Sequence, residues 1–174
     1  FQDELSNACR VGISLYGLSP YTNALKSVVS LYTQIFMTKT IHKGETVGYG
    51  ALHTAEEDEI IGTCPIGYAD GFIRKNTGRK VYDGEYAEVV GNVCMDQTMI
   101  RLPHDVKVGT TVEIFGDHIS IEQMAQELDT ISYEIMCLIS ERVTRKYIRH
   151  NKVMKECNQR LINSNIQKNN IISH

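Results

Sequence analysis

Short runs of alternating apolar residues, separated by turns that contain Gly or Asp, dominate the middle of this 174-residue chain. Val29, Leu31, Ile35 and Met37 recur on one parity, which predicts a single half-buried strand through residues 27–39. The other segments expected to be strands are residues 59–65, 80–82, 86–94, 97–102 and 110–115. Asp83-Gly84 lies between two of them, as in a tight hairpin whose glycine accepts a positive φ. Short strands with such turns predict a barrel or a sandwich.

Two helices are expected after these strands. Ser120 and Gln123 have the spacing of a capping box, in which each side chain bonds the other residue's backbone N–H. The helix that follows has one apolar face, made of Ile121, Met124, Ala125 and Leu128. Ser132 is expected to cap the second helix, with an inward face made of Ile135, Leu138 and Ile139.

The two ends of the chain have a different character. Residues 11–15 are a short apolar run, which predicts one buried strand of an α/β unit whose neighbouring strands are absent from this sequence. A single strand is not stable by itself, so the sequence is expected to begin inside a domain that it does not complete. After about residue 155 the chain is Asn-rich and weakly patterned, and we expect this tail to be disordered.

Composition narrows the class of protein further. Hydrophobic residues make up 42% and charged residues 22%, as in ordinary globular domains, and no apolar run reaches the roughly 18 residues of a membrane span. Residues 1–150 carry 14 Lys and Arg against 20 Asp and Glu, an acidic balance that argues against a nucleic-acid partner. The first ten residues lack the features of a secretory signal. The five Cys and six His are scattered, so we expect reduced, mostly buried thiols, a cytoplasmic location and no metal site.

Three segments carry candidate chemistry. Tyr49 and Tyr68 each lie beside glycines at the end of an expected strand, where the backbone can approach a ligand and the phenol can project. The alternative is that both are rim tyrosines packed by the barrel. Residues 94–97 (CMDQ) place polar side chains after a strand, although they could simply begin a turn. Residues 10–13 (RVGI) offer a cation and two backbone amides to an anion, unless Arg10 is an ordinary surface residue.

Together these segments resemble the C-terminal part of alanine racemase over nearly all of residues 8–150. The segments that carry the resemblance are RVGISLYG (10–17), KGETVGYG (43–50), IGTCPIGYADGF (61–72), VVGNVCMDQTMI (89–100), VGTTVEIFG (108–116) and ISYEIMCLISERVTR (131–145). The resemblance implies a mainly β chain. Residues 1–24 would hold the last strand of an incomplete (β/α)8 barrel, residues 25–155 a β-barrel or β-rich domain with two short helices, and residues 156–174 a polar tail.

The resemblance also implies roles for individual residues. Tyr49 matches the family's catalytic tyrosine, which exchanges a proton with one face of the substrate α-carbon while a lysine serves the other face. Arg10 matches the arginine that faces the pyridine nitrogen of pyridoxal 5'-phosphate (PLP). The remaining matches are Gly12, Ile13 and Tyr133 at the cofactor phosphate, Met95 and Asp96 at the substrate carboxylate, and Tyr68 at the entrance to the site. Because a bare Asp would repel a carboxylate, we interpret Asp96 as an orienting or structural residue.

The implied protein is a cytoplasmic homodimer that interconverts L- and D-alanine for peptidoglycan, with each active site shared between two subunits. No lysine of this chain lies in the context of the family's cofactor lysine, so the chain alone is expected to be inactive. Val11, His53 and Thr144 depart from the residues usual in the family. Three alternatives remain: the matching part of a serine racemase, the β domain of a related decarboxylase, or a non-catalytic β module or gene remnant that acts as a folding or interaction unit.

Overall fold

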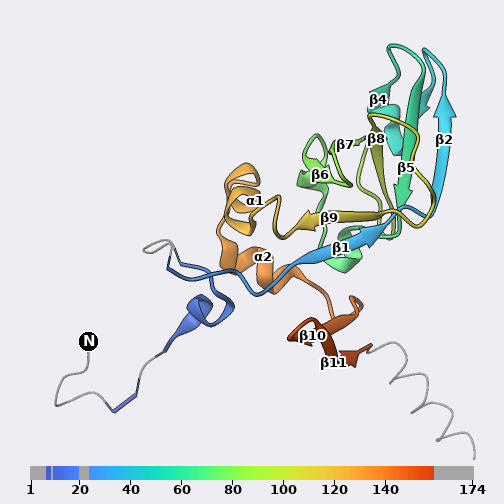
Figure 1. Cartoon of the computed structure of the whole chain (residues 1–174). Helices are drawn as coiled ribbons and strands as arrows, with labels where there is room; N and C mark the ends of the chain where they lie inside the picture. Colours follow the sequence, from blue (N-terminus) through green and yellow to red (C-terminus); the bar gives the residue numbers. More distant parts are fainter. Residues whose placement is uncertain (1–6, 9, 20–23, 159–174) are drawn as a thin grey trace, which may run out of the picture.

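A seven-stranded antiparallel sheet organises the chain (Figure 1). The computed structural model describes residues 7–8, 10–19 and 24–158. The strands follow the spatial order β1-β9-β6-β7-β8-β5-β2. Their bounds are β1 Leu31–Gln34, β2 Met37–Ile41, β5 Glu59–Cys64, β6 Lys80–Tyr82, β7 Tyr86–Val90, β8 Thr98–Leu102 and β9 Thr111–Phe115. The mainly β fold predicted from the sequence is therefore confirmed, and each segment expected to be a strand in residues 59–115 contains one.

The sheet curls because its two edge strands, β1 and β2, are consecutive in the chain. Only Ile35 and Phe36 separate them, and these two residues bond to different parts of the sheet. Ile35 N–H donates to Thr110 O, just before β9 (2.9 Å), and Phe36 N–H donates to Thr63 O in β5 (2.9 Å). The prediction of one continuous strand over residues 27–39 is therefore wrong. The chain leaves β9 and joins β5 at this point, and Met37 becomes 48% exposed although its parity predicted burial.

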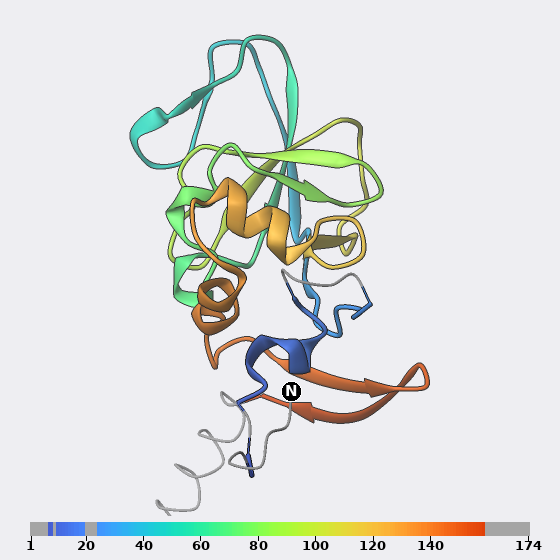
Figure 2. The same ribbon diagram turned by 90° about the vertical axis from the view of Figure 1, so that its left-hand side faces the viewer.

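The curl encloses the main hydrophobic core, and two helices cover part of it (Figure 2). In α1 (Ile121–Glu127) and its C-cap Leu128, the four predicted apolar positions are all buried. The predicted capping box is half formed: Gln123 N–H donates to Ser120 Oγ (3.0 Å), but the Gln123 side chain bonds Glu127 instead. Helix α2 (Ser132–Leu138) begins after Ile131, so Ser132 is its first residue and not its cap.

The segment that precedes the sheet is not the strand that the sequence predicted. Residues Gly12–Tyr16 form a short 3-10 helix, η1, and the described residues contain no strand before Leu31. Gly12 has φ +63° and Gly17 has φ +76°, and backbone in this left-handed region cannot continue an extended strand. Gly17 N–H closes the turn on Ser14 O at 3.1 Å. The predicted burial is also only partly observed, because Ile13 is buried while Val11 is 49% exposed and Leu15 is 72% exposed.

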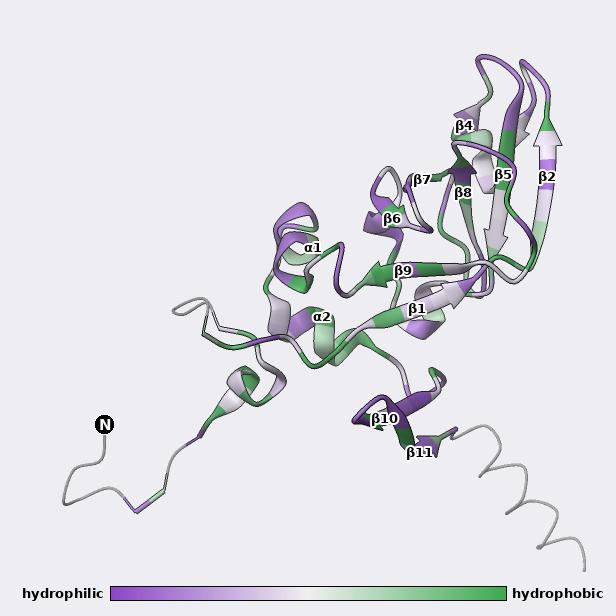
Figure 3. Ribbon diagram, viewed as in Figure 1, coloured by the Kyte–Doolittle hydropathy of each residue, from purple (hydrophilic) through white to green (hydrophobic). Residues whose placement is uncertain are grey.

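Two small β ribbons complete the fold. Strands β3 (Thr46–Val47) and β4 (His53–Thr54) form one, and strands β10 (Arg145–Arg149) and β11 (Lys152–Cys157) form the other. The sequence did not predict the second ribbon, which is exposed along almost its whole length and largely hydrophilic (Figure 3). The expected tail of residues 156–174 begins inside β11, and residues 159–174 lie outside the described part of the chain.

The cysteines and the lengths of the helices bear on the class of protein. The four described cysteines, Cys64, Cys94, Cys137 and Cys157, are free thiols, as expected, but only Cys64 is buried, so the expected burial of most of them is wrong for the described residues. Cys9 lies outside the described residues. Burial raises the pKa of the Cys64 thiol to about 12, with a smaller contribution from the charge of Asp83. Within the described ranges, no helix has both the length and the apolar character needed to cross a bilayer.

Candidate functional site

Tyr49 lies on a turn that projects it away from the core. The turn follows β3, and its glycines, Gly48 (φ +73°) and Gly50 (φ +77°), adopt backbone conformations that other residues rarely tolerate. The Tyr49 residue is 78% exposed, so this chain does not pack it as a rim tyrosine. Of the two interpretations that the sequence left open for Tyr49, this exposure favours the projecting phenol.

Tyr68 lies on a second turn, η3 (Tyr68–Asp70), which docks on the loop after β7. Tyr68 N–H donates to Cys94 O (3.0 Å) and Ala69 N–H donates to Met95 O (3.1 Å). This docking requires a glycine before Tyr68, because a Cβ on Gly67 would lie 2.3 Å from Cys94 O. The position of Tyr68 is thus fixed by backbone contacts with the CMDQ segment.

A cavity of about 960 Å³ brings Tyr49, Tyr68, Met95 and Asp96 together. These are four of the eight residues that the sequence singled out. The other residues that line the cavity are Met37, Gly48, Thr63, Arg74, Asn92, Val93, Cys94, Gln97 and Met99. Sequence reasoning missed Arg74 and Asn92, because polar residues in turns carry no pattern that distinguishes them from ordinary surface residues. The cavity combines phenols, a guanidinium and a carboxamide, groups that suit a small polar or anionic ligand.

The Asp96 carboxylate beside this cavity is paired with a cation. Arg142 Nη2 donates to Asp96 Oδ1, and Arg142 Nε lies 3.5 Å from Asp70 Oδ1. The hydrogen bond with Asp96 is the main cause that raises the pKa of Arg142, and the charge of Asp70 adds to it. The pairing offsets the negative charge of Asp96, in keeping with the interpretation of this residue as orienting. No motif or spacing in the sequence pointed to Arg142.

The other predicted residues form a second group. Gly12 and Ile13 begin η1, Arg10 is exposed just before it, and Tyr133 is half exposed on α2. The fold brings Gly12 and Tyr133 together, because a Cβ on Gly12 would lie 3.9 Å from Tyr133 Cε1. No residue of this group lines the 960 Å³ cavity. Both views place η1 near α2 and the β10–β11 ribbon, at the opposite end of the molecule from β3 and β4 (Figures 1 and 2).

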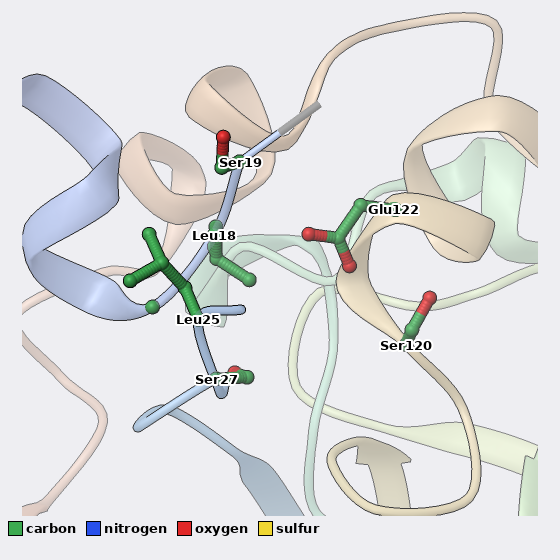
Figure 4. A pocket seen from close by; sticks show the side chains of 7 residues that line it. Leu18, Ser19, Leu25, Ser27, Ser120 and Glu122 are labelled. Carbon is green, nitrogen blue, oxygen red and sulfur yellow. The ribbon is translucent and has the colours of Figure 1, made fainter. Parts of the chain in front are cut away.

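A smaller hollow of about 360 Å³ lies between residues 17–19, Leu25 and Ser27 on one side and the start of α1 on the other (Figure 4). Serines, leucines and one carboxylate surround it, as the labelled side chains show: Leu18, Ser19, Leu25, Ser27, Ser120 and Glu122. Among the described residues, its lining includes no cationic, phenolic or thiol group and none of the predicted site residues. We therefore assign it no chemistry.

Comparisons with known proteins agree on one family. Residues 28–147 match the family model described as alanine racemase, C-terminal domain. The chain is 47% identical over 154 residues to the alanine racemase of Listeria monocytogenes, which covers 82% of this chain and 42% of that protein. It is 44% identical over 167 residues to the alanine racemase of Geobacillus stearothermophilus, which covers 89% of this chain and 43% of the relative.

Solved structures give the same result. The alanine racemase of Bacillus anthracis with bound L-Ala-P superposes with a TM-score of 0.83 and 37% identity, covering 87% of this chain and 42% of that one. The Clostridium difficile alanine racemase in complex with cycloserine gives a TM-score of 0.79 and 39% identity, covering 84% and 42%. The chain thus spans about two-fifths of the length of the relatives it matches. It belongs to the alanine racemase family and corresponds to the C-terminal part of its members.

Proposed function

We propose that this chain is the C-terminal part of a PLP-dependent alanine racemase that interconverts L- and D-alanine. The observation that carries the proposal is Tyr49, which is exposed on a glycine-flanked turn at a cavity that also contains Tyr68, Met95 and Asp96. The names of the relatives support alanine as the substrate. D-Alanine for peptidoglycan and a cytoplasmic location are part of the same proposal.

Racemisation requires two bases, one on each face of the α-carbon. In the proposed reaction the Cα–H bond breaks on one face and its proton passes to the Tyr49 phenolate oxygen. A new C–H bond then forms on the opposite face, with a proton from a lysine in the N-terminal part of the enzyme. Met95 N–H would bind the substrate carboxylate, and Tyr68 would narrow the entrance so that a small side chain is preferred.

The second group of residues fits a phosphorylated pyridine. The first turn of a helix leaves backbone N–H groups without intrahelical partners, and the N–H groups of Gly12 and Ile13 lie in the first turn of η1. The Tyr133 ring lies beside Gly12, since a Cβ on Gly12 would be 3.9 Å from Tyr133 Cε1, so the Tyr133 hydroxyl could bind the same phosphate as these amides. Arg10 remains protonated and would donate to the pyridine nitrogen. When bound, PLP supplies the electron withdrawal that makes the α-proton acidic.

The two groups of residues lie apart, which supports a homodimer with shared active sites. The cavity that contains Tyr49 has no residue from η1 or α2 in its lining. Each chain would therefore provide the cavity with Tyr49 to one active site and the cradle with Arg10, Gly12, Ile13 and Tyr133 to the other. A barrel with a cofactor lysine completes each site, so the 174-residue chain with added PLP should not racemise alanine.

A chimeric racemase tests the proposal. Residues 8–158 are fused to the N-terminal part of the Geobacillus stearothermophilus alanine racemase in place of the matching region. Racemisation is followed by circular dichroism from each enantiomer. We expect activity in the parent chimera and a loss of about 10²–10⁴-fold in kcat for Tyr49→Phe. Tyr147→Phe, a change of another exposed tyrosine on β10, is the matched control and should retain full activity.

Two results would contradict the proposal. One is a folded, PLP-loaded parent chimera that does not racemise alanine. The other is a Tyr49→Phe chimera that still inverts both enantiomers, and exchanges their α-protons with deuterated water, at the parent rate.

A further inference from the structure

The side chain of Asn92 joins the Tyr49 turn to Arg74. Asn92 Nδ2 donates to Tyr49 O at 2.7 Å, and Asn92 Oδ1 accepts from Arg74 Nη2 at 2.7 Å. We propose that Asn92 is a positioning residue for proton transfer, which fixes the Tyr49 backbone so that the phenol meets the α-carbon. Arg74 would act through Asn92 by holding its carboxamide in place. The inference rests on the proposed function, because it assumes that Tyr49 exchanges the proton.

The Tyr49 turn needs such a tie because its own residues provide little rigidity. Glycines have the widest choice of backbone conformations, and Tyr49 lies between two of them. The ring is 78% exposed, so packing within this chain does not set its direction. Within the turn, the bond from Ala51 N–H to Gly48 O is long, at 3.4 Å. The bond from Asn92 is much shorter and comes from outside the turn.

Arg74 determines which way the Asn92 carboxamide faces. A guanidinium has only donors, so the Asn92 oxygen must face Arg74 and the NH₂ group must face the carbonyl of Tyr49. The reversed amide would place two donors together at Arg74 and two acceptors together at Tyr49. The chain of bonds from Arg74 to Asn92 to Tyr49 therefore has a single orientation in which all groups are satisfied.

The backbone around Asn92 packs closely against the backbone that leads into the Tyr49 turn. A Cβ on Gly91 would lie 2.7 Å from Val47 O, and a Cβ on Gly48 would lie 3.4 Å from Asn92 N, so the two backbone segments touch. The same loop continues to Cys94, whose carbonyl accepts from Tyr68 N–H. Residues 91–95 thus hold both tyrosines of the cavity, one through the Asn92 side chain and the other through backbone bonds.

The test compares variants in the chimeric racemase described above. Asn92→Asp keeps an oxygen for Arg74 but replaces the donor to Tyr49 O with an acceptor, and Asn92→Ala removes both bonds. Arg74→Gln weakens the hold on Asn92 while the Asn92 donor to Tyr49 O remains in the chain. The matched control is Asn151→Asp, which makes the same change in the exposed turn between β10 and β11. We expect both Asn92 variants to lose about 10- to 100-fold in kcat, with KM changed less than about threefold.

A second measurement separates positioning from a general weakening of the structure. Tyr49 acts on one face of the α-carbon, so a misplaced phenol slows proton abstraction from one enantiomer only. With α-deuterated alanine, the isotope effect on kcat should rise at least about 1.5-fold for that enantiomer in the Asn92 variants. It should not rise for the other enantiomer, because there the lysine removes the α-proton and the phenol acts only in the second, reprotonation step. Arg74→Gln should show the same asymmetry with a smaller loss. In the 174-residue chain, amide exchange at residues 48–51 should be about tenfold faster in Asn92→Ala.

The outcomes distinguish this inference from the proposed function. If Tyr49→Phe has no effect, the proposed function fails and the inference fails with it. If Tyr49→Phe is inactive while Asn92→Asp and Asn92→Ala keep the parent kcat, or raise the isotope effects of both enantiomers equally, only the inference is refuted. Should the Asn92 variants not fold, Arg74→Gln decides alone, since Arg74 is exposed, and symmetric isotope effects in that variant refute the inference.

Discussion

Replacement of Arg142 by Leu should destabilise the chain mainly through Asp70, although Arg142 makes its shorter contact with Asp96. The Asp96 side chain is 47% exposed, and ion pairs so open to water contribute roughly 0–1 kcal/mol. The Asp70 side chain is only 12% exposed, so without Arg142 its carboxylate loses its cation in a place that water hardly reaches. It keeps one hydrogen bond, from Gly67 N–H to Asp70 Oδ2 at 3.0 Å. We therefore expect a total loss of about 2 kcal/mol for Arg142→Leu.

Double-mutant cycles in the 174-residue chain measure the two contributions separately. The free energy of unfolding is obtained from urea titrations of Arg142→Leu, Asp70→Asn, Asp96→Asn and the two double variants at pH 7. The coupling of Arg142 with Asp70 should be about 1–2 kcal/mol and should persist in 0.5 M NaCl. The coupling with Asp96 should be less than about 0.5 kcal/mol and should decline with salt. The reasoning is refuted if the loss from Arg142→Leu disappears in the Asp96→Asn background but is fully retained in the Asp70→Asn background.

Three further predictions use the chain itself. Burial alone would raise the pKa of Glu113, but hydrogen bonds from the His118 side chain and the backbone N–H groups of Ile119 and His118 lower it below 4.5. The stability that Glu113 provides is therefore present above about pH 4.5 and is lost as the pH falls through its folded-state pKa. In urea titrations, the free energy of unfolding of Glu113→Gln should fall less over this acidic range than that of the parent chain. Gly67→Ala should cost at least about 2 kcal/mol, because its Cβ would clash with two backbone carbonyls, and an unchanged urea midpoint would contradict this. Iodoacetamide at pH 8 should label exposed Cys137 in the native chain but not buried Cys64, whose pKa of about 12 keeps it a thiol; mass spectrometry detects the difference.

Local patterns predicted strands that bury at least one face. In β8 the buried residues alternate and in β9 four consecutive residues are buried, and the sequence placed both strands within about a residue. The ribbon of β10 and β11 was missed because both of its faces are exposed, so no alternation marks it. The break at Ile35–Phe36 was also missed, since it depends on which strands lie on each side of the curled sheet. Glycines at positive φ explain why the apolar run at residues 11–15 is a 3-10 turn.

The candidate site shows the same division between local and distant information. Tyr49 and Tyr68 could be found from the sequence because their glycines are adjacent in the chain. Asn92 and Arg142 could not, because their partners lie 43 and 46 residues away, at Tyr49 and Asp96. Such pairs form only after the loop following β7 packs against turns from other parts of the chain. Residues that position other residues are therefore harder to predict than the residues that they position.

The separation of the two groups of site residues leads to a complementation experiment. If Tyr49 of one subunit works with Arg10 of its partner, a heterodimer of Tyr49→Phe and Arg10→Ala chimeras has one site with both defects and one site with neither. Equal co-expression with random pairing makes half of the dimers heterodimers, so activity should return to about a quarter of the parent value, although each variant alone is nearly inactive. If one chain supplied both residues to a single site, every site would carry one defect and mixing would restore nothing. Selective purification of the heterodimer with two different affinity tags should raise the activity to about half of the parent value. Residual activity of either homodimer could not produce this increase, because both homodimers are removed.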